Sequence, residues 1–187
     1  MADTQALSLT EWLVVALLGE RPAHGFAIAR QLEPDTDLGR ILTVHRPLVY
    51  RALDRVVAAG LAARRQREPG AAGPTRTVHA LTPAGRHALD EWLDTPVEHV
   101  RDMRIELLAK LRLLRRSGRS PLHLVGAQRR ALAETLDALA ALTDRPDEVD
   151  LWRHHNAVAT MGFLDAVEQA ERASGGGTGS TPLPPHG

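Results

Sequence analysis

One β-prone hairpin, placed behind three helical segments, is the feature that most restricts the fold of this 187-residue chain. The loop at 69–74 contains two prolines and two glycines and separates residues 61–68 from the β-prone run at 75–81. A turn-rich loop between two such runs predicts a hairpin. The hairpin is therefore one small β element in a chain whose other segments have helical patterns.

Three helices are predicted before the hairpin. Ser8 and Glu11 form the hydroxyl-and-carboxylate pair of a capping box, so the first helix begins at Ser8 and ends near Gly19. A second helix is expected at about 24–32, with Phe26 among its buried residues. A third begins at Pro47, because proline suits the first positions of a helix.

The third helix has a predicted inner and outer face. Its inner face carries the apolar residues Val49, Leu53, Val56 and Val57 at helical spacing. The opposite face carries Arg51, Asp54, Arg55 and Ala58, and we expect Asp54 to pair with one of these arginines. Gly60 follows, where a helix end favours a left-handed residue.

A fourth helix is predicted after the hairpin, from the cap Thr82-Pro83 to about Leu93. Beyond Pro96 the pattern is helical, with helices at about 97–116, 120–142 and 148–173. The predicted fold is mainly α: a winged helix-turn-helix over 1–95, a helical dimerisation domain over 96–173 and a disordered tail over 174–187.

Composition limits the remaining classes. Cysteine is absent, which excludes disulfides and thiolate metal sites, and no apolar run reaches the length of a membrane span. The first residues lack the basic region of a secretory signal, so we expect a cytoplasmic protein without membrane association. The nine histidines are scattered, and no motif of a metal site, phosphate loop or catalytic triad occurs, so we expect no metal, no cofactor and no enzyme.

Positive charge is concentrated in one segment, although the formal net charge is zero. Residues 1–39 hold two arginines and six acidic residues, whereas residues 40–79 hold eight arginines and two acidic residues. Residues 80–187 hold 13 basic and 15 acidic residues. A local excess of this kind is typical of a surface that contacts phosphate, although a solvated basic face has the same composition.

The basic segment coincides with the third helix and the hairpin, which predicts double-stranded DNA as the partner. In a winged helix-turn-helix the third helix enters the major groove, and the hairpin forms the wing. Arginine can pair with guanine or hold a phosphate. The predicted DNA-binding residues are His45, Arg46, Pro47, Leu48, Tyr50, Arg51 and Arg55 of the helix, and Arg64, Arg65, Arg67 and Arg76 of the wing. Arg64 and Arg65 are adjacent, so on a regular strand they point to opposite faces.

Four ordered blocks of sequence resemble the PadR family of transcriptional regulators. They are residues 9–18 (LTEWLVVALL), 24–28 (HGFAI), 49–53 with 59–61 (VYRAL and AGL), and 81–86 (LTPAGR). Together they cover about residues 8–93.

The resemblance implies a dimeric regulator, usually a repressor, whose C-terminal helices form the dimer contact. The length beyond Pro96 is similar to that of the longer subgroup, which has a separate helical domain. Pro47 and Leu48 stand where the family has a small residue and a hydroxyl, and His79 stands where it favours an aromatic residue. At Pro47 and Leu48 the family's hydroxyl contact to phosphate is therefore not carried over, and Leu48 instead suits a thymine methyl group. At His79 any aromatic contact from the wing strand is not carried over.

Some family members bind aromatic molecules near the dimer interface, so Trp12, Trp92 and Trp152 are candidates for stacking a small aromatic effector; the alternative is that they are core residues. The predicted function is a dimeric repressor on a pseudo-palindromic operator, released by such an effector. A MarR-like regulator is a second hypothesis, but it would use helices from both ends and no helical pattern precedes Ser8. A winged-helix module that binds protein rather than DNA, and more distantly a ligand carrier, are the alternatives from other classes.

Overall fold

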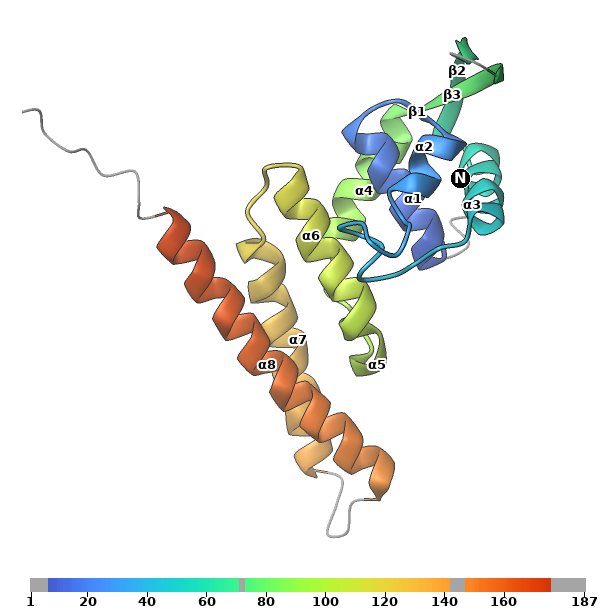
Figure 1. Cartoon of the computed structure of the whole chain (residues 1–187). Coiled ribbons are helices and arrows are strands. Elements are labelled where there is room, and N and C mark those ends of the chain that lie inside the picture. The colour runs from blue at the N-terminus through green and yellow to red at the C-terminus, as the bar shows by residue number, and fades with distance from the viewer. Residues whose placement is uncertain (1–6, 71–72, 142–146, 176–187) are drawn as a thin grey trace, which may run out of the picture. The chain divides into compact units, whose positions relative to one another are not determined.

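The computed structural model describes residues 7–70, 73–141 and 147–175. The chain divides into two compact units, Met1–Arg119 and Ser120–Gly187. The first unit contains the elements α1 (Leu9–Glu20), β1 (Ala23–His24), α2 (Gly25–Arg30), α3 (Arg46–Ala58), β2 (Ala62–Gly70), β3 (Gly73–Leu81), α4 (Pro83–Asp94), α5 (Val100–Asp102), the π-helical segment η1 (Met103–Leu107) and α6 (Leu108–Arg116) (Figure 1). The mainly helical fold with one small sheet agrees with the prediction.

Helix α1 is the centre of the first unit. All six residues from Leu13 to Leu18 are buried, and α1 contacts α2, α3, α4 and β3. Its predicted capping box is present: the Ser8 backbone N–H donates to Glu11 Oε2 at 2.7 Å, and the Glu11 N–H donates to Ser8 Oγ at 3.4 Å. The box satisfies backbone groups that the first turn of a helix leaves free. It therefore fixes where the central helix begins.

Helix α3 packs its predicted inner face against the core. Val49, Leu53 and Val56 are buried, together with Ala52, whereas Val57 is only partly covered. The helix ends before Gly60, whose φ of 74° is the left-handed conformation expected there. The predicted cap of α4 is also present, because the Gly85 N–H donates to Thr82 Oγ1 at 3.0 Å.

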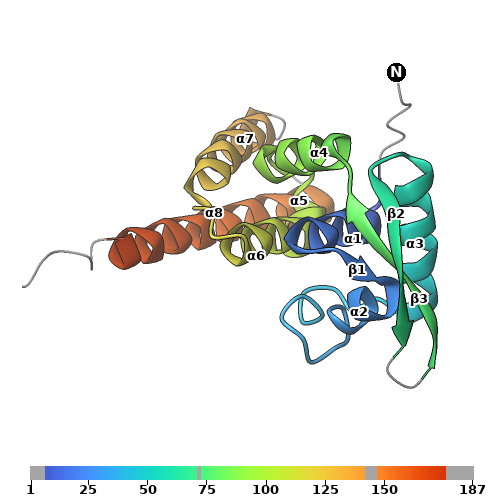
Figure 2. The same cartoon turned by 90° about the horizontal axis from the view of Figure 1, so that it is seen from above.

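The sheet has the order β1-β3-β2, and both pairs are antiparallel. Strands β2 and β3 form the predicted hairpin, which projects as a ribbon beside α3 in both views (Figures 1 and 2). Strand β1 was not predicted. It has two residues, pairing Ala23 with His79 and His24 with Val78, and a strand of that length carries no alternation that could be recognised. Its effect is to join the start of α2 to the wing.

The helix predicted at 97–116 differs from the observed one. It begins at Val100 and contains the π-helical turn η1 before α6. Hydrogen bonds in a π turn are less favourable than in an α-helix, so tertiary contacts must stabilise it. Glu106 within η1 provides such a contact by accepting from Trp92 Nε1 of α4 at 3.2 Å, and it also pairs locally with Lys110 Nζ, four residues further on, at 2.9 Å. The spacing of apolar residues contains no information on such polar contacts, so the π turn could not be predicted from it.

The structural division falls at 119/120, whereas the sequence placed a boundary at 95/96. Helix α6 stays with the first unit because its side chains pair with α1 and α4. Arg116 pairs with Glu20 at 2.7 Å, and Lys110 donates to the Thr95 carbonyl oxygen at 2.8 Å. The functional assignment of residues 96–173 to dimerisation stays a prediction.

The second unit contains the antiparallel pair α7 (Leu122–Ala141) and α8 (Glu148–Gly175). Arg129 of α7 donates to Glu168 of α8 at 2.7 Å, and Leu132 and Leu164 are fully buried. Of the predicted disordered tail, residues 174 and 175 lie in α8, and the rest lies outside the described residues. Within the described residues, no helix is both long and apolar enough to cross a membrane.

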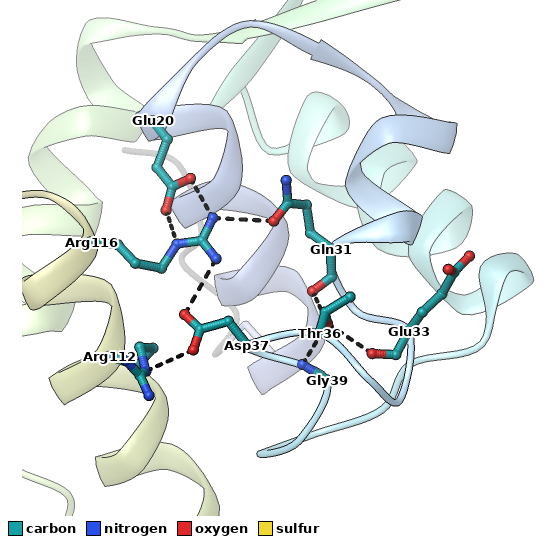
Figure 3. Close-up of polar contacts among 8 residues, drawn as sticks. All are labelled: Glu20, Gln31, Glu33, Thr36, Asp37, Gly39, Arg112 and Arg116. Atoms are coloured by element: carbon teal, nitrogen blue, oxygen red, sulfur yellow. Dashed lines mark hydrogen bonds and ion pairs between the residues drawn. The ribbon is translucent and has the colours of Figure 1, made fainter.

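A polar network in the first unit joins α6 to the loop that leads into α3 (Figure 3). Arg116 binds both carboxylate oxygens of Glu20 at 2.7 Å and the amide oxygen of Gln31 at 3.2 Å. Arg112 pairs with Asp37 at 3.1 Å. Thr36 closes the loop, accepting from the Gly39 N–H at 3.0 Å. The network therefore fixes the path of the chain between α2 and α3.

We expect Arg116→Gln to lower the free energy of unfolding by about 1–2 kcal/mol, because it removes a bidentate, partly buried ion pair. Urea denaturation measures the change. Arg40→Gln is the matched control, since Arg40 is an exposed arginine of the same loop. Equal stability of the two variants would contradict a stabilising role for the network.

Candidate nucleic-acid interface

Helix α3 presents an exposed face opposite its buried stripe. His45, Arg46, Pro47, Leu48, Tyr50, Arg51 and Arg55, the residues predicted to contact DNA from this helix, are all exposed. Leu48 and Tyr50 are 47% and 44% exposed, which is unusual for large apolar and aromatic side chains. Among the described residues, no carboxylate oxygen lies within 4.0 Å of the Arg51 guanidinium, in contrast to that of Arg55. The side chains of Leu48 and Arg51 are therefore available to a partner.

Arg55 has a different environment from Arg51. Its Nε lies 2.8 Å from Oε1 of Glu11, and Glu11 is only 5% exposed. We expected Asp54 to pair with an arginine of its own helix, but the carboxylate that binds Arg55 belongs to α1. Glu11 thus serves both the capping box and the attachment of α3. The ion pair aligns the recognition helix on α1 and limits the freedom of the Arg55 guanidinium.

The wing adds exposed arginines beside α3. Arg64, Arg65 and Arg76 are exposed, whereas the side chain of Arg67 lies outside the described residues. Arg64 pairs with His79 and Gln66 pairs with Val78, so the register shifts by one residue at Arg65. The extra residue of a bulge bends a strand and turns its side chains. The opposite orientation expected for Arg64 and Arg65 assumed a regular strand, which is not what forms.

A cavity of about 500 Å³ lies between α2, α3 and the wing. It is lined by His24, Gly25, Phe26, Tyr50, Leu53, Asp54, Arg64, Arg76, Thr77 and His79. His79 is 7% exposed, and its Nδ1 has no hydrogen-bond partner within the described part of the chain. Burial lowers the pKa of His79, and the neighbouring Arg64 lowers it further. His79 is therefore a buried residue of β3 that is mostly neutral at pH 7.

Gly25 determines how Tyr50 lies at the edge of this cavity. A Cβ atom at Gly25 would lie 2.6 Å from the Tyr50 ring, closer than van der Waals contact allows. The glycine thus lets the ring of Tyr50 pack against the start of α2. Tyr50 remains 44% exposed, so part of its side chain faces solvent. Gly25, the first residue of α2, therefore shapes the surface beside α3.

Trp12 and Trp92 lie together in the first unit, and Trp152 belongs to the second. Trp12 and Trp92 stack on each other, with ring centroids 5.1 Å apart, and Lys110 Nζ lies 4.9 Å from the Trp92 centroid. Burial lowers the pKa of Lys110, and Glu106 opposes that shift. Trp152 lies in the second unit, on an exposed part of α8. Trp92 is 8% exposed and has the environment of a core residue.

Sequence patterns missed three residues that shape this surface. Glu11 was recognised only as a helix cap, and its ion pair with Arg55 crosses 44 positions of sequence. His24 was predicted only as the start of the second helix, and its contact with Arg76 was not expected. Phe26 was expected to be buried, but its ring is partly covered and contacts the guanidinium groups of two arginines. No pattern of spacing contains these contacts, because they join elements that the fold brings together.

Three helices followed by a two-stranded wing and a fourth helix, with basic side chains on the third helix and the wing, define a winged helix-turn-helix protein. The pattern of the Transcriptional regulator PadR-like family matches residues 14–91, which span α1 to α4. Residues 14–91 therefore form a domain that is similar to the PadR-like family of transcriptional regulators.

Solved structures with a similar course of the chain include PadR from Bacillus subtilis in complex with operator DNA. That chain has 17% sequence identity and a TM-score of 0.45, over 89% of this chain and 99% of the other. Another is smu.1604c from Streptococcus mutans UA159, with 16% identity and a TM-score of 0.41, over 86% of this chain and 98% of the other. No curated protein matches the chain.

The buried His79 predicts a pH dependence of stability. Because its pKa is lowered in the folded state, the unfolded chain binds more protons below the ordinary value of 6.5, so the free energy of unfolding falls as pH falls through that range. Urea denaturation between about pH 7.5 and 5.5 measures this loss, which is at most about 1.4 kcal/mol per pH unit.

His79→Phe should reduce the loss, since the other eight of the nine histidines are shared by both proteins. The phenylalanine also restores the aromatic type favoured by the family. The same pH dependence in the wild type and in His79→Phe would show that His79 does not titrate in this way.

Proposed function

We propose that this protein is a dimeric, sequence-specific DNA-binding repressor. The observation that carries the proposal is the exposed basic surface formed jointly by α3 and the wing, with Arg51, Arg64 and Arg76 on it. The segment that builds this surface, residues 40–79, also holds the chain's excess of positive charge. An α-helix fits the major groove of B-DNA, and a wing beside it reaches the neighbouring backbone. The match of residues 14–91 to a family of transcriptional regulators supports the same function.

Within this proposal Arg51 and Leu48 are the principal candidates for base contacts. Both are exposed on α3, and Arg51 has no carboxylate within ion-pair distance among the described residues. A guanidinium can pair with guanine O6 and N7, and an apolar side chain can contact a thymine methyl group. Arg55 is retained as a contact to DNA, but its ion pair with Glu11 gives it a structural role as well. Arg64, Arg65, Arg67 and Arg76 are proposed to contact phosphate or the minor groove.

A second copy of the chain is proposed to cover an apolar face of α8. Trp152, Ala159, Phe163 and Ala166 follow one another at intervals of seven, four and three, which places them on one face, and all four are exposed. Exposed apolar surface of this kind is typical of an interaction site. A two-fold dimer would place its recognition helices in successive major grooves of a pseudo-palindromic operator.

Release by a small aromatic effector stays part of the proposal. Trp12 and Trp92 are already stacked on each other, so a ligand there would have to extend or separate that stack. Trp152 lies on the exposed face of α8, where a dimer would bury it with any ligand bound between the copies. Fluorescence of the three tryptophans during titration with aromatic compounds would report such binding.

The experiment that tests the function is selection of bound sequences from random DNA with the purified protein. A repressor of this class should yield an inverted repeat with half-sites about one helical turn apart. The affinity for that site should fall steeply with salt, because phosphate contacts release counterions. Transcription in vitro from a promoter containing the site should fall as the protein is added. A protein-interaction module would show no salt-dependent affinity.

Arg51→Ala should weaken binding to the selected operator by about 1–3 kcal/mol, which is about 5- to 150-fold in Kd. Arg55→Ala should also weaken it, and should in addition lower the free energy of unfolding because Glu11 loses its partner. Fluorescence anisotropy and urea denaturation measure the two effects. If the double variant Arg51→Ala/Arg55→Ala bound the operator as tightly as the wild type, neither arginine would be part of the DNA interface.

Phe163→Glu should convert the dimer to a monomer, because it places a charge in the apolar face of α8. Analytical ultracentrifugation measures the oligomeric state. His154→Glu, an exposed substitution on another side of the same helix, is the control and should leave the dimer intact. A dimer that survives Phe163→Glu would mean that this face of α8 is not the dimer contact.

A further inference from the structure

The ring of Phe26 is a meeting point for two arginines of different elements. Cζ of Arg46, at the start of α3, lies 4.7 Å from the ring centroid, and Cζ of Arg76, on β3, lies 5.1 Å from it. Guanidinium groups are attracted to the faces of aromatic rings, and these distances lie within the range of that interaction. One side chain of α2 therefore holds a cation from the recognition helix and a cation from the wing.

The two cations lie near each other, and among the described side chains only one carboxylate, that of Glu33, pairs with them. Glu68 stands opposite Arg76 in the hairpin register, but its side chain lies outside the described residues. Since both lie within about 5 Å of one centroid, they are at most about 10 Å apart. Arg46 has one carboxylate neighbour, Glu33, at 3.7 Å, and both side chains are about half exposed, so that ion pair is weak. Arg76 instead lies beside His24, with 3.5 Å between Nη1 and Nε2.

His24 adds a third donor. Its Nδ1 accepts a hydrogen bond from the Ala27 backbone N–H at 3.0 Å, so in the neutral imidazole the proton is on Nε2. The Nε2–H of His24 and the guanidinium of Arg76 are then both donors and do not hydrogen bond to each other. Two donors side by side are satisfied by an acceptor placed between them. This arrangement is independent of the ring contacts and is compatible with an anionic acceptor such as a phosphate oxygen.

We propose that His24, Phe26, Arg46 and Arg76, named here the Phe26 cluster, bind the phosphate backbone of DNA. The inference rests on the proposed function and adds to it a specific contact. The cluster lies where α2, the start of α3 and the wing approach one another, next to the groove-binding face (Figures 1 and 2). Its two cations are close enough to contact one phosphate or two successive ones, which rise by about 3.4 Å along a strand.

Phe26 is a positioning residue in this proposal. It does not touch the phosphate itself, but its ring orients two guanidinium groups that would otherwise repel each other and move freely in solvent. Contacts to phosphate fix how a protein lies on the duplex without reading its sequence. The Phe26 cluster therefore sets the angle at which α3 enters the groove, while Arg51 and Leu48 contact the bases.

The test measures operator affinity against salt concentration for the full-length wild type, Arg76→Gln, Phe26→Leu and Phe26→Tyr. Arg76→Gln should lower the slope of log affinity against log salt by about 0.9 for each phosphate that the variant no longer neutralises. Phe26→Leu should lower affinity about 3- to 10-fold, and Phe26→Tyr, which keeps the ring, should restore it. The Phe26→Leu and Arg76→Gln effects should be less than additive in the double variant, because both act on the same phosphate interaction.

Operator DNA with single uncharged methylphosphonates locates the contact. At one or two backbone positions the methylphosphonate should weaken binding of the wild type clearly more than binding of Arg76→Gln, which has already lost part of the contact to that phosphate. Arg76 is exposed, so this variant tests the proposal even if Phe26→Leu does not fold. One outcome is that the wild type binds DNA with a steep salt slope while Arg76→Gln and Phe26→Leu have the same affinity and slope as the wild type. That result would overturn the proposed role of the Phe26 cluster and leave the proposed function intact. No salt-dependent binding by the wild type would overturn both.

Discussion

Burial of α1 is the constraint on which the first unit depends. Its residues Leu13–Leu18 are buried all around the helix, so neighbours are required on every side. Helices α2, α3 and α4 and strand β3 supply them. Full burial of six apolar side chains stabilises the unit by roughly 1.5–3 kcal/mol for each of the larger ones. The recognition helix and the wing are therefore both held against one rigid element, and their spacing follows from the width of that core.

Ion pairs then decide which of the many arginines are available to a partner. Arg55 is bound by Glu11, Arg116 by Glu20, and Arg112 by Asp37. These pairs connect elements of the fold and use acidic residues of the first 39 positions, where negative charge is in excess. Arg51 and Arg76 are exposed, and neither has a carboxylate within ion-pair distance in the described parts of the chain. The zero net charge of the chain is thus compatible with a strongly basic surface on α3 and the wing.

Local signals in the sequence predicted most of the elements correctly. The Ser8 capping box, the glycine after α3 and the Thr82-Pro83 cap each depend on chemistry within a few residues, and all three are present. The two-residue strand β1, the π turn η1 and the bulge at Arg65 were missed. Each of them depends on a partner in another element, such as His79 of β3 for Ala23 and Trp92 of α4 for Glu106. The exposed positions of the predicted interface follow from helix periodicity, whereas their partners do not.

The sequence alone determined the order of the elements, the faces of α3, the concentration of positive charge and the resemblance to the family, because these are properties of neighbouring residues. Only the tertiary structure decided that Arg55 binds Glu11, that α6 belongs to the first compact unit, and that Phe26 holds Arg46 and Arg76 together. The physical reason is that a side chain's partner depends on which elements pack against each other. Packing is set by the buried surface of the whole core, and no local pattern contains that information.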